Sequence, residues 1–248
     1  MINTAVILAA GTGSRLKDIT KSRPKGFISI GRKPVIKLSI EKLFDAGIAK
    51  IIIGTGFLSD IYEKFAQKYS GIECVKNPVF KDTGSMYTLY NLRRKIDADF
   101  LLLESDLVYE KKGLRVLLKD SHKDVILSSG STFSEDEVYI EVDKDGYLMK
   151  MSKKIQELGY VHSELVGISK ISLPVFKKMC GFAETVFPNN PKLDYEYAMV
   201  GISQEAKFFV RKEDDLIWCE IDNADHLRKA RQIIYPKIRG RESNVKYC

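Results

Sequence analysis

The sequence has few of the residues that build several common kinds of site. Its three histidines belong to no catalytic motif, so nucleophilic catalysis of the Ser/His/Asp or Cys/His type is not indicated. Its cysteines are far apart and form neither a CxxC pair nor a metal-finger spacing, a pattern typical of the reducing cytoplasm. These residues are His122, His162 and His226, and Cys74, Cys180, Cys219 and Cys248.

Long apolar runs and clusters of basic residues are also missing. No run approaches the length of a membrane span, and the first apolar run, 5–10, lacks the preceding Lys or Arg of a signal peptide. The 40 Lys+Arg and 33 Asp+Glu give a net charge of +7, but the basic residues are spread among acids. The sequence therefore predicts neither a nucleic-acid nor a membrane partner, and a cytoplasmic protein.

The length and the order of patterns predict the fold. In 248 residues we expect one large α/β domain over 1–238. Apolar runs alternate with helical periodicity, which predicts a mixed, mainly parallel central sheet flanked by helices, Rossmann-like in its layers. A turn at 143–146 predicts a β-hairpin inserted over the sheet. The polar, aperiodic residues 239–248 predict a flexible tail or a linker stub.

The most informative stretch is 4–25, an apolar run that ends in glycines. Gly11 and Gly13 let the main chain approach phosphate oxygens, and Arg15 and Lys25 supply positive charge. The dinucleotide pattern is disfavoured because Leu16 stands where a small residue is needed, and no Gly-Lys-Ser/Thr follows as in a Walker A loop. The alternative is an ordinary tight turn.

The longer signature Leu-Ala-Ala-Gly-x-Gly-x-Arg, followed by Pro-Lys, resembles the nucleotidyltransferase family that joins an NTP to a phosphorylated small molecule. This family includes the sugar-phosphate nucleotidylyltransferases and small cytidylyltransferases acting on phosphocholine or 2-aminoethylphosphonate. The resemblance implies a nucleotide-diphospho-sugar transferase-like fold. It also implies nucleotide binding by the first strand and loop and by a later Gly-containing segment; our candidates are Leu8, Ala9, Ala10, Gly11, Gly13, Gly84, Ser85 and Ser105.

Acids at strand ends predict a magnesium site. The apolar strand 100–104 leads to Asp106, and the strand 216–221 leads to Asp222, so both carboxylates should reach the carboxyl edge of the sheet, where Mg²⁺ on a triphosphate would lie. Glu104 shares the face of Asp106 by alternation. As alternatives, Asp106 or Asp222 could cap the helix that follows it.

A candidate catalytic lysine and candidate residues for the acceptor come from two later segments. The family resemblance implies a phosphate-binding lysine after the hairpin, Lys153 or Lys154. Asp194, Tyr195 and Glu196 combine carboxylates with an aromatic ring, a composition suited to an ammonium group, and Tyr139 is a further candidate. The alternatives are solvated lysines, an ordinary helix start at 194–196, and a capping role for Ser85.

These residues predict transfer of CMP from CTP to a small amine-bearing phosphonate or phosphate, with release of pyrophosphate. The acceptor is already an anion near neutral pH, so no strong general base is needed. We expect Arg15 to bind the β- and γ-phosphates and Lys25 the α-phosphate. 2-Aminoethylphosphonate is the preferred acceptor, with phosphocholine, a sugar 1-phosphate and a non-catalytic nucleotide-sensing domain as alternatives. A fused downstream domain or a homodimer is left open.

Overall fold

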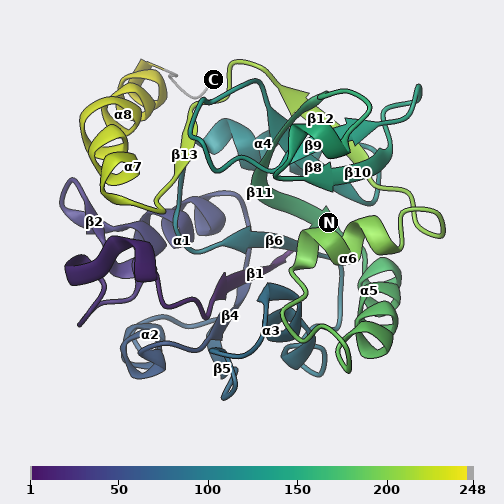
Figure 1. Cartoon of the computed structure of the whole chain (residues 1–248). Coiled ribbons are helices and arrows are strands. Elements are labelled where there is room, and N and C mark those ends of the chain that lie inside the picture. The colour runs from purple at the N-terminus through teal and green to yellow at the C-terminus, as the bar shows by residue number, and fades with distance from the viewer. Residues whose placement is uncertain (1, 245–248) are drawn as a thin grey trace.

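The computed structural model describes residues 2–244, and its centre is a sheet built around the first strand. β1 (Thr4–Ala9) is buried along its whole length and lies between two parallel neighbours, β4 (Lys50–Thr55) and β6 (Phe100–Glu104). Within the described residues the sheet has nine strands, and part of their order is visible in Figure 1. The longest path through it is β10 (Leu148–Ser152), β9 (Tyr139–Val142), β11 (Ser163–Ile171), β6, β1, β4 and β5 (Ile72–Lys76).

The remaining strands extend this sheet or form small ladders beside it. β8 (Val125–Ser129) pairs with β11, and β12 (Phe209–Glu213) pairs with β8. β2 (Ser29–Ile30) pairs with β3 (Lys33–Pro34), and β7 (Leu107–Tyr109) pairs antiparallel with β13 (Trp218–Glu220). The last strand of the chain therefore lies in a ladder of its own and not in the central sheet.

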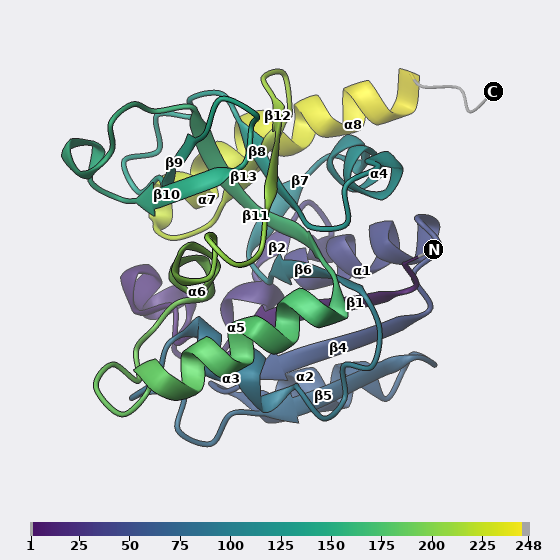
Figure 2. The same ribbon diagram turned by 90° about the vertical axis from the view of Figure 1, so that its right-hand side faces the viewer.

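Helices cover both faces of the central sheet. Successive side chains of β1 point to opposite faces, and all of them are apolar after Thr4, so each face has apolar side chains to bury. Ala5 and Ile7 pack in a core with α1 (Val35–Asp45), α2 (Ser59–Ala66) and α4 (Lys111–Lys119). Val6 and Leu8 pack in a second core with α3 (Ser85–Asn91), α5 (Leu173–Val186) and α6 (Tyr195–Gly201). Figure 2 shows α3 and α5 in front of the strands. The predicted α/β fold is confirmed.

The hairpin and the tail differ from their predictions. The hairpin β9–β10 hydrogen-bonds to β11 and extends the edge of the sheet, whereas the sequence predicted that it would lie over the sheet. Residues 239–244, predicted as part of a flexible tail, are helical, and 245–248 lie outside the described residues. Two further helices, α7 (Ala224–Lys229) and α8 (Tyr235–Asn244), are joined by a π-helical turn at Ala230–Ile234. In residues 2–244 we find no helix that is long and apolar enough to cross a membrane.

Tertiary contacts explain why residues 239–244 are ordered despite their polar sequence. Ile238 is buried in a third core with α7 and the β7–β13 ladder. Arg241 donates a hydrogen bond to Glu110, at 3.0 Å, and Glu110 is itself buried and accepts from the Ile217 N–H. Glu242 accepts a hydrogen bond from the Lys111 N–H at the start of α4. These contacts are invisible to a periodicity argument.

We predict that Arg241→Ala lowers the stability of the protein while Arg239→Ala does not. The first change leaves the buried Glu110 carboxylate with one donor fewer, at a cost of about 1–2 kcal/mol. Arg239 is exposed and serves as the matched control. Thermal unfolding measures both variants, and equal melting temperatures for the two would mean that α8 does not dock as described.

Candidate functional site

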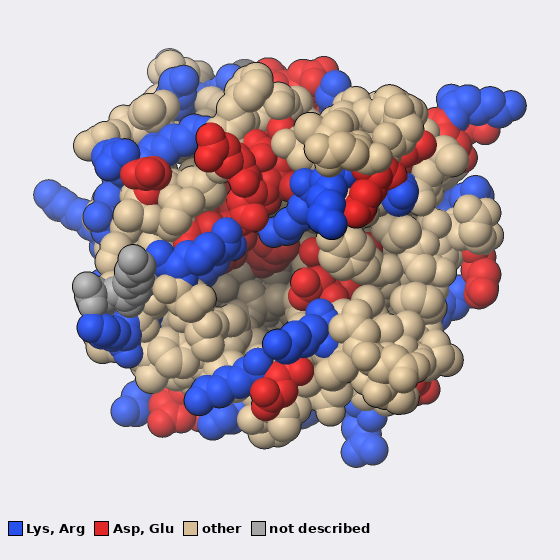
Figure 3. Space-filling model, in the orientation of Figure 1, with Lys and Arg blue, Asp and Glu red and all other residues tan. Residues whose placement is uncertain are grey.

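A cavity of about 430 Å³ opens where the parallel strands end. Its walls come from the glycine loop after β1, the start of α3, the end of β6, the amino-terminal half of β11, the start of α6 and the segment between β13 and α7. Figure 3 shows a hollow in this face of the molecule, with acidic and basic side chains gathered around it. A cavity at the carboxyl ends of parallel strands is the usual ligand position in an α/β sheet.

The glycine loop forms one wall of the cavity. Gly13 has a φ of +64°, and a Cβ there would lie 2.8 Å from Cγ of Lys25, so only glycine fits beside this lysine. A Cβ on Gly11 would meet open space, which leaves room for a ligand against the main chain. Leu8 and Ala10 also line the cavity. Ala9 does not, because it faces the opposite core.

Lys25 joins the two predicted metal ligands. Its Nζ donates to Asp106 Oδ2 at 2.9 Å and to Asp222 Oδ1 at 2.5 Å. Although burial opposes its charge, these carboxylates raise the pKa of Lys25 above its usual value. Burial would raise the pKa of Asp222, but Lys25 outweighs it and the pKa is lowered to about 2. Arg15 also donates to Asp222, at 2.7 Å. The predicted convergence of these four residues is therefore observed.

Neither aspartate has the capping role that was its alternative. α7 is capped by Asn223, whose side chain accepts from the N–H groups of Asp225 and His226. α4 is preceded by Glu110 rather than by Asp106. Asp106 and Asp222 are thus left to the cavity wall, where both interact with Lys25.

Three carboxylates come close enough to hold a metal ion, and one of them was missed by sequence reasoning. Glu104, Asp106 and Glu220 each offer an oxygen within 4.8 Å of the others. Burial, with the neighbouring acids, raises the pKa of Glu104 to about 8 and raises the pKa of Glu220 well above its usual value. Such a set of oxygen ligands fits Mg²⁺. Asp222, the second predicted ligand, lies beside this set, engaged with Lys25 and Arg15.

The position of Glu104 depends on two neighbours. Tyr195 is buried, and its hydroxyl donates to Glu104 Oε1 at 2.6 Å. Gly167 on β11 has a φ of +81°, and a Cβ there would lie 3.1 Å from the Glu104 carboxyl carbon. The hydroxyl of Tyr195, which was predicted to bind the acceptor, is therefore used in a hydrogen bond to Glu104.

Asp194 and Ser85 connect the starts of two helices. Asp194 Oδ1 accepts from the Ser85 N–H at 3.0 Å and from its hydroxyl at 2.9 Å, and Ser85 Oγ accepts from the Tyr195 N–H. Ser85 is not the N-cap of α3, which is Gly84; its N–H and hydroxyl instead hold the start of α3 to the start of α6. Gly84 is required by packing, because a Cβ there would lie 2.3 Å from the Leu193 carbonyl oxygen. Gly84, Ser85 and Ser105 line the cavity nonetheless.

Glu196 differs from its neighbours because its carboxylate is buried without a basic partner. In the described part of the chain, no cation lies within salt-bridge distance of it, although the side chain lines the cavity and is 8% exposed. Burial, and then Asp194, raises the pKa of Glu196 to about 7. A buried carboxylate open to a cavity is suited to binding a cationic group of a ligand.

The segment 130–138 closes the outer side of the cavity. Asp136 accepts from both Arg15 and Lys153, so the structure brings Lys153 to the wall, while Lys154 pairs with Glu157. Tyr139 is not among the residues that line the cavity, but its hydroxyl donates at 3.3 Å to Glu137, which is one of them. Sequence reasoning also missed Asp136, which no regular spacing marks.

Comparison with known proteins identifies the class that this fold and site define. The sequence profile described as nucleotidyl transferase matches residues 4–135. The chain belongs to the nucleotidyl transferase family. The predicted relationship to this family and to its small cytidylyltransferases is thereby confirmed, and with it the expectation of a nucleotidyltransferase enzyme.

Individual relatives span nearly the same length. The chain is 24% identical over 234 residues to choline-phosphate cytidylyltransferase of Streptococcus pneumoniae, covering 93% of this chain and 97% of the relative. The solved structure of the CTP:phosphocholine cytidylyltransferase of that organism has a TM-score of 0.77 at 23% identity, covering 94% and 99%.

Two other relatives are named for different acceptors. The chain is 25% identical over 244 residues to CTP:phosphoglutamine cytidylyltransferase of Campylobacter jejuni, covering 88% and 95%. It is 25% identical over 185 residues to 2-aminoethylphosphonate cytidylyltransferase of Lancefieldella rimae, covering 74% and 72%.

We predict that Glu196→Gln stabilises the ligand-free protein at pH 8 but not at pH 4. Because its pKa is raised, the folded protein carries a penalty that grows as pH rises from the unfolded value near 4.5 to about 7 and is complete above it. Removing the ionisable group should gain about 2–3 kcal/mol at pH 8. Denaturant unfolding at both pH values measures the effect.

The control for this variant is Glu157→Gln. Glu157 is an exposed carboxylate paired with Ser152 and Lys154, and its pKa is lowered by these contacts. Neutralising Glu157 should not stabilise the protein at pH 8. If Glu196→Gln behaved in the same way as this control, Glu196 would not carry the burial penalty described.

Proposed function

We propose that this protein is a cytidylyltransferase that transfers CMP from CTP to a small amine-bearing phosphonate or phosphate, with 2-aminoethylphosphonate as the preferred acceptor. The observation that carries the acceptor class is the buried Glu196 carboxylate, which faces the cavity without a cation of its own. A primary ammonium group would donate charge-assisted hydrogen bonds to it. The names of the relatives support the use of CTP.

The residues next to Glu196 support a primary amine rather than a choline group. Recognition of a quaternary ammonium relies on aromatic faces, because such a group has no N–H to donate. Of the two rings that adjoin Glu196 in sequence, Tyr195 uses its hydroxyl to bind Glu104, and Tyr197 does not line the cavity. Phosphocholine remains the second candidate, because the relative from Streptococcus pneumoniae is named for it.

The charges of the wall support a role for Mg²⁺. Among the described residues that line the cavity, nine are Asp or Glu and four are Lys or Arg. A triphosphate would be repelled by such a surface unless cations accompanied it. Glu104, Asp106 and Glu220 would hold the ion, and Asp222 lies next to them. When bound, Mg²⁺ would neutralise phosphate charge as the leaving group departs.

The chain's own residues would supply positioning and charge. An acceptor oxygen attacks the α-phosphorus in line and pyrophosphate leaves, a reaction driven by orientation and electrostatic stabilisation. Lys25, fixed by Asp106 and Asp222, would contact the α-phosphate, and Arg15 and Lys153 would contact the outer phosphates. Gly11 gives the main chain access to the ligand. Glu196 would hold the acceptor's ammonium group.

The test is a pyrophosphate-release assay with four nucleotides against a panel of acceptors. CTP, UTP, GTP and ATP would each be paired with 2-aminoethylphosphonate, phosphocholine and glucose 1-phosphate, with and without Mg²⁺. We expect the highest kcat/KM for CTP with 2-aminoethylphosphonate, and a loss of about a hundredfold or more in Lys25→Ala. Release with no pair would favour a nucleotide-sensing domain, and a preference for glucose 1-phosphate would overturn the acceptor assignment.

We also predict a pH dependence of acceptor binding that Glu196 controls. Because burial raises its pKa to about 7, Glu196 is largely protonated at pH 6 and cannot pair with an ammonium group there. The KM for 2-aminoethylphosphonate at saturating CTP should fall by about tenfold between pH 6 and pH 8. Glu196→Gln should have a high KM at both pH values, while an unchanged KM in this variant would remove Glu196 from the acceptor site.

A further inference from the structure

Asp136 forms ion pairs with two basic side chains that would otherwise be available to bind a nucleotide's phosphates. One of its carboxylate oxygens accepts from Arg15, and the other accepts from Lys153 Nζ at 2.9 Å. Arg15 contacts a second carboxylate as well, that of Asp222, at 2.7 Å. Both cations are therefore neutralised by carboxylates of the chain itself.

We propose that Asp136 is an internal substitute for the nucleotide's phosphates: it binds Arg15 and Lys153 in the ligand-free protein and is displaced from them when a polyphosphate binds. This inference rests on the proposed function, because it requires an anionic ligand with several phosphate groups. It adds a residue that sets the affinity for nucleotides with outer phosphates. Asp136 does so by competing with them for the same donors.

Of the two carboxylates on Arg15, Asp136 is the one placed to be released. Asp222 is 2% exposed, also bonds to Lys25, and lies two residues after the end of β13. Asp136 lies in an irregular segment, and its side chain is 20% exposed. Removing Asp222 from Arg15 would disturb the Lys25 contacts, whereas among the described residues the release of Asp136 breaks its pairs with Arg15 and Lys153 alone.

The segment 130–138 is anchored on one side of Asp136 and strained next to it. Glu164 accepts from the Ser131 hydroxyl and the Thr132 N–H, both at 2.8 Å, and Lys229 donates to the Thr132 carbonyl. Glu135 has a φ of +67°, in the left-handed region that non-glycine residues rarely adopt. The conformation next to Asp136 is thus a costly one.

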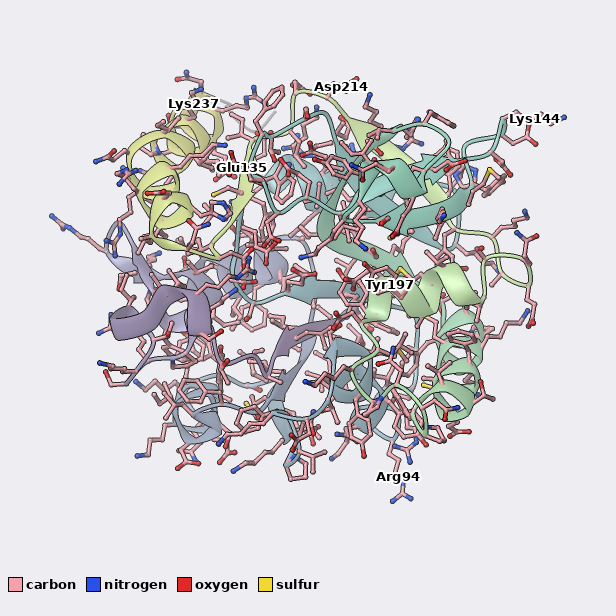
Figure 4. The ribbon with its side chains drawn as sticks, in the orientation of Figure 1. Arg94, Glu135, Lys144, Tyr197, Asp214 and Lys237 are labelled. Carbon is pink, nitrogen blue, oxygen red and sulfur yellow. The ribbon has the colours of Figure 1, made fainter. Side chains whose placement is uncertain are left out.

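Figure 4 shows where this segment lies. Glu135, labelled there, is on the loop beside α7, and the His226 ring of α7 bonds to the Ser134 carbonyl oxygen at 2.9 Å. The anchors thus hold 131–134 in place, and the release of Asp136 needs only a local change at 135–136. The change does not require the sheet or α7 to move.

The number of phosphate groups decides whether a ligand competes with Asp136. The outer phosphates of CTP would replace Asp136 at Arg15 and at Lys153, whereas CMP has only the α-phosphate, which the proposed function places at Lys25. Displacement of Asp136 should therefore reduce the affinity for CTP more than the affinity for CMP. The side chain acts on nucleotide affinity through Arg15 and Lys153 and does not touch the reacting atoms.

The experiment measures equilibrium binding of CTP and of CMP, at fixed Mg²⁺ and ionic strength, to the wild type, Asp136→Asn and Glu135→Gln. Glu135→Gln removes the same charge from the neighbouring position, where the side chain is exposed and absent from the cavity wall. We expect Asp136→Asn to bind CTP about threefold to tenfold more tightly, and Glu135→Gln to match the wild type within about twofold. Because CMP lacks the outer phosphates, the ratio of the CMP to the CTP dissociation constant should rise in Asp136→Asn, and a ratio that fell would overturn the inference.

A second background tests the mechanism. In a Lys153→Met protein, the gain from Asp136→Asn should shrink, because one of the two contested cations is gone. Equal or weaker binding of CTP by Asp136→Asn would overturn the inference and assign Asp136 to holding the cations in place. Equal gains in Asp136→Asn and Glu135→Gln would also overturn it, since they would show a general effect of charge.

Failure of the proposed function gives a different result. If the wild type bound neither CTP nor CMP, the cytidylyltransferase assignment would fail, and inorganic tripolyphosphate would then be the probe for Asp136. Tighter binding of tripolyphosphate by Asp136→Asn than by Glu135→Gln would still support the competition between Asp136 and phosphates, and no difference would overturn it.

Discussion

The pair of contacts from Lys25 to Asp106 and Asp222 is the interaction on which the arrangement of the cavity depends. The two aspartates lie 81 and 197 residues from the lysine along the chain. Asp106 lies between β6 and β7, and Asp222 follows β13. Without a cation between them, the carboxylates at this edge of the sheet would repel one another at short range. The Lys25 ammonium group therefore holds Asp106 and Asp222 in place. Glu104 and Glu220, which lie close to Asp106, depend on the same arrangement.

The β7–β13 ladder fixes the register of these acids. Glu220 is opposite Leu107, and the Ile221 N–H donates to the Asp106 carbonyl at 3.2 Å, so the two chain segments cross at a defined point. The same pattern, glutamate then aspartate two residues later, occurs in both segments, and strand alternation turns each pair toward one side. The C-terminal helices support the ladder through the core that contains Ile238. A polar helix far from the cavity thus contributes to its geometry.

Local patterns predicted the parts of the site that depend on local physics. The glycine loop, the buried strands and the placement of Asp106 and Asp222 at strand ends follow from composition and from the topology of a parallel sheet. Glu220 was missed, although its spacing to Asp222 repeats the spacing of Glu104 to Asp106. Tyr139, predicted to bind the acceptor, does not line the cavity, and its hydroxyl bonds to Glu137, which does.

Other features depend on contacts that no sequence pattern reports. The helix at residues 239–244 is held by the hydrogen bond from Arg241 to the buried Glu110. Asp194 accepts a hydrogen bond from Ser85, which is distant in sequence. Asp136 belongs to a segment with neither helical nor strand periodicity, so its pairing with Arg15 could be found only from the folded chain. Tertiary partners, rather than propensity, determine all three.

The charge of the cavity wall constrains which pair of ligands it can accept. Even without counting Glu104 and Glu220, whose pKa values are raised by burial, the lining carboxylates outnumber the lining cations. A sugar phosphate would bring two negative charges and no positive one, so its binding would add to this imbalance. The proposed aminoalkyl phosphonate would carry its own ammonium group and place it against Glu196. The excess of carboxylates that would favour a divalent cation beside the proposed nucleotide would therefore also favour an amine on the proposed acceptor.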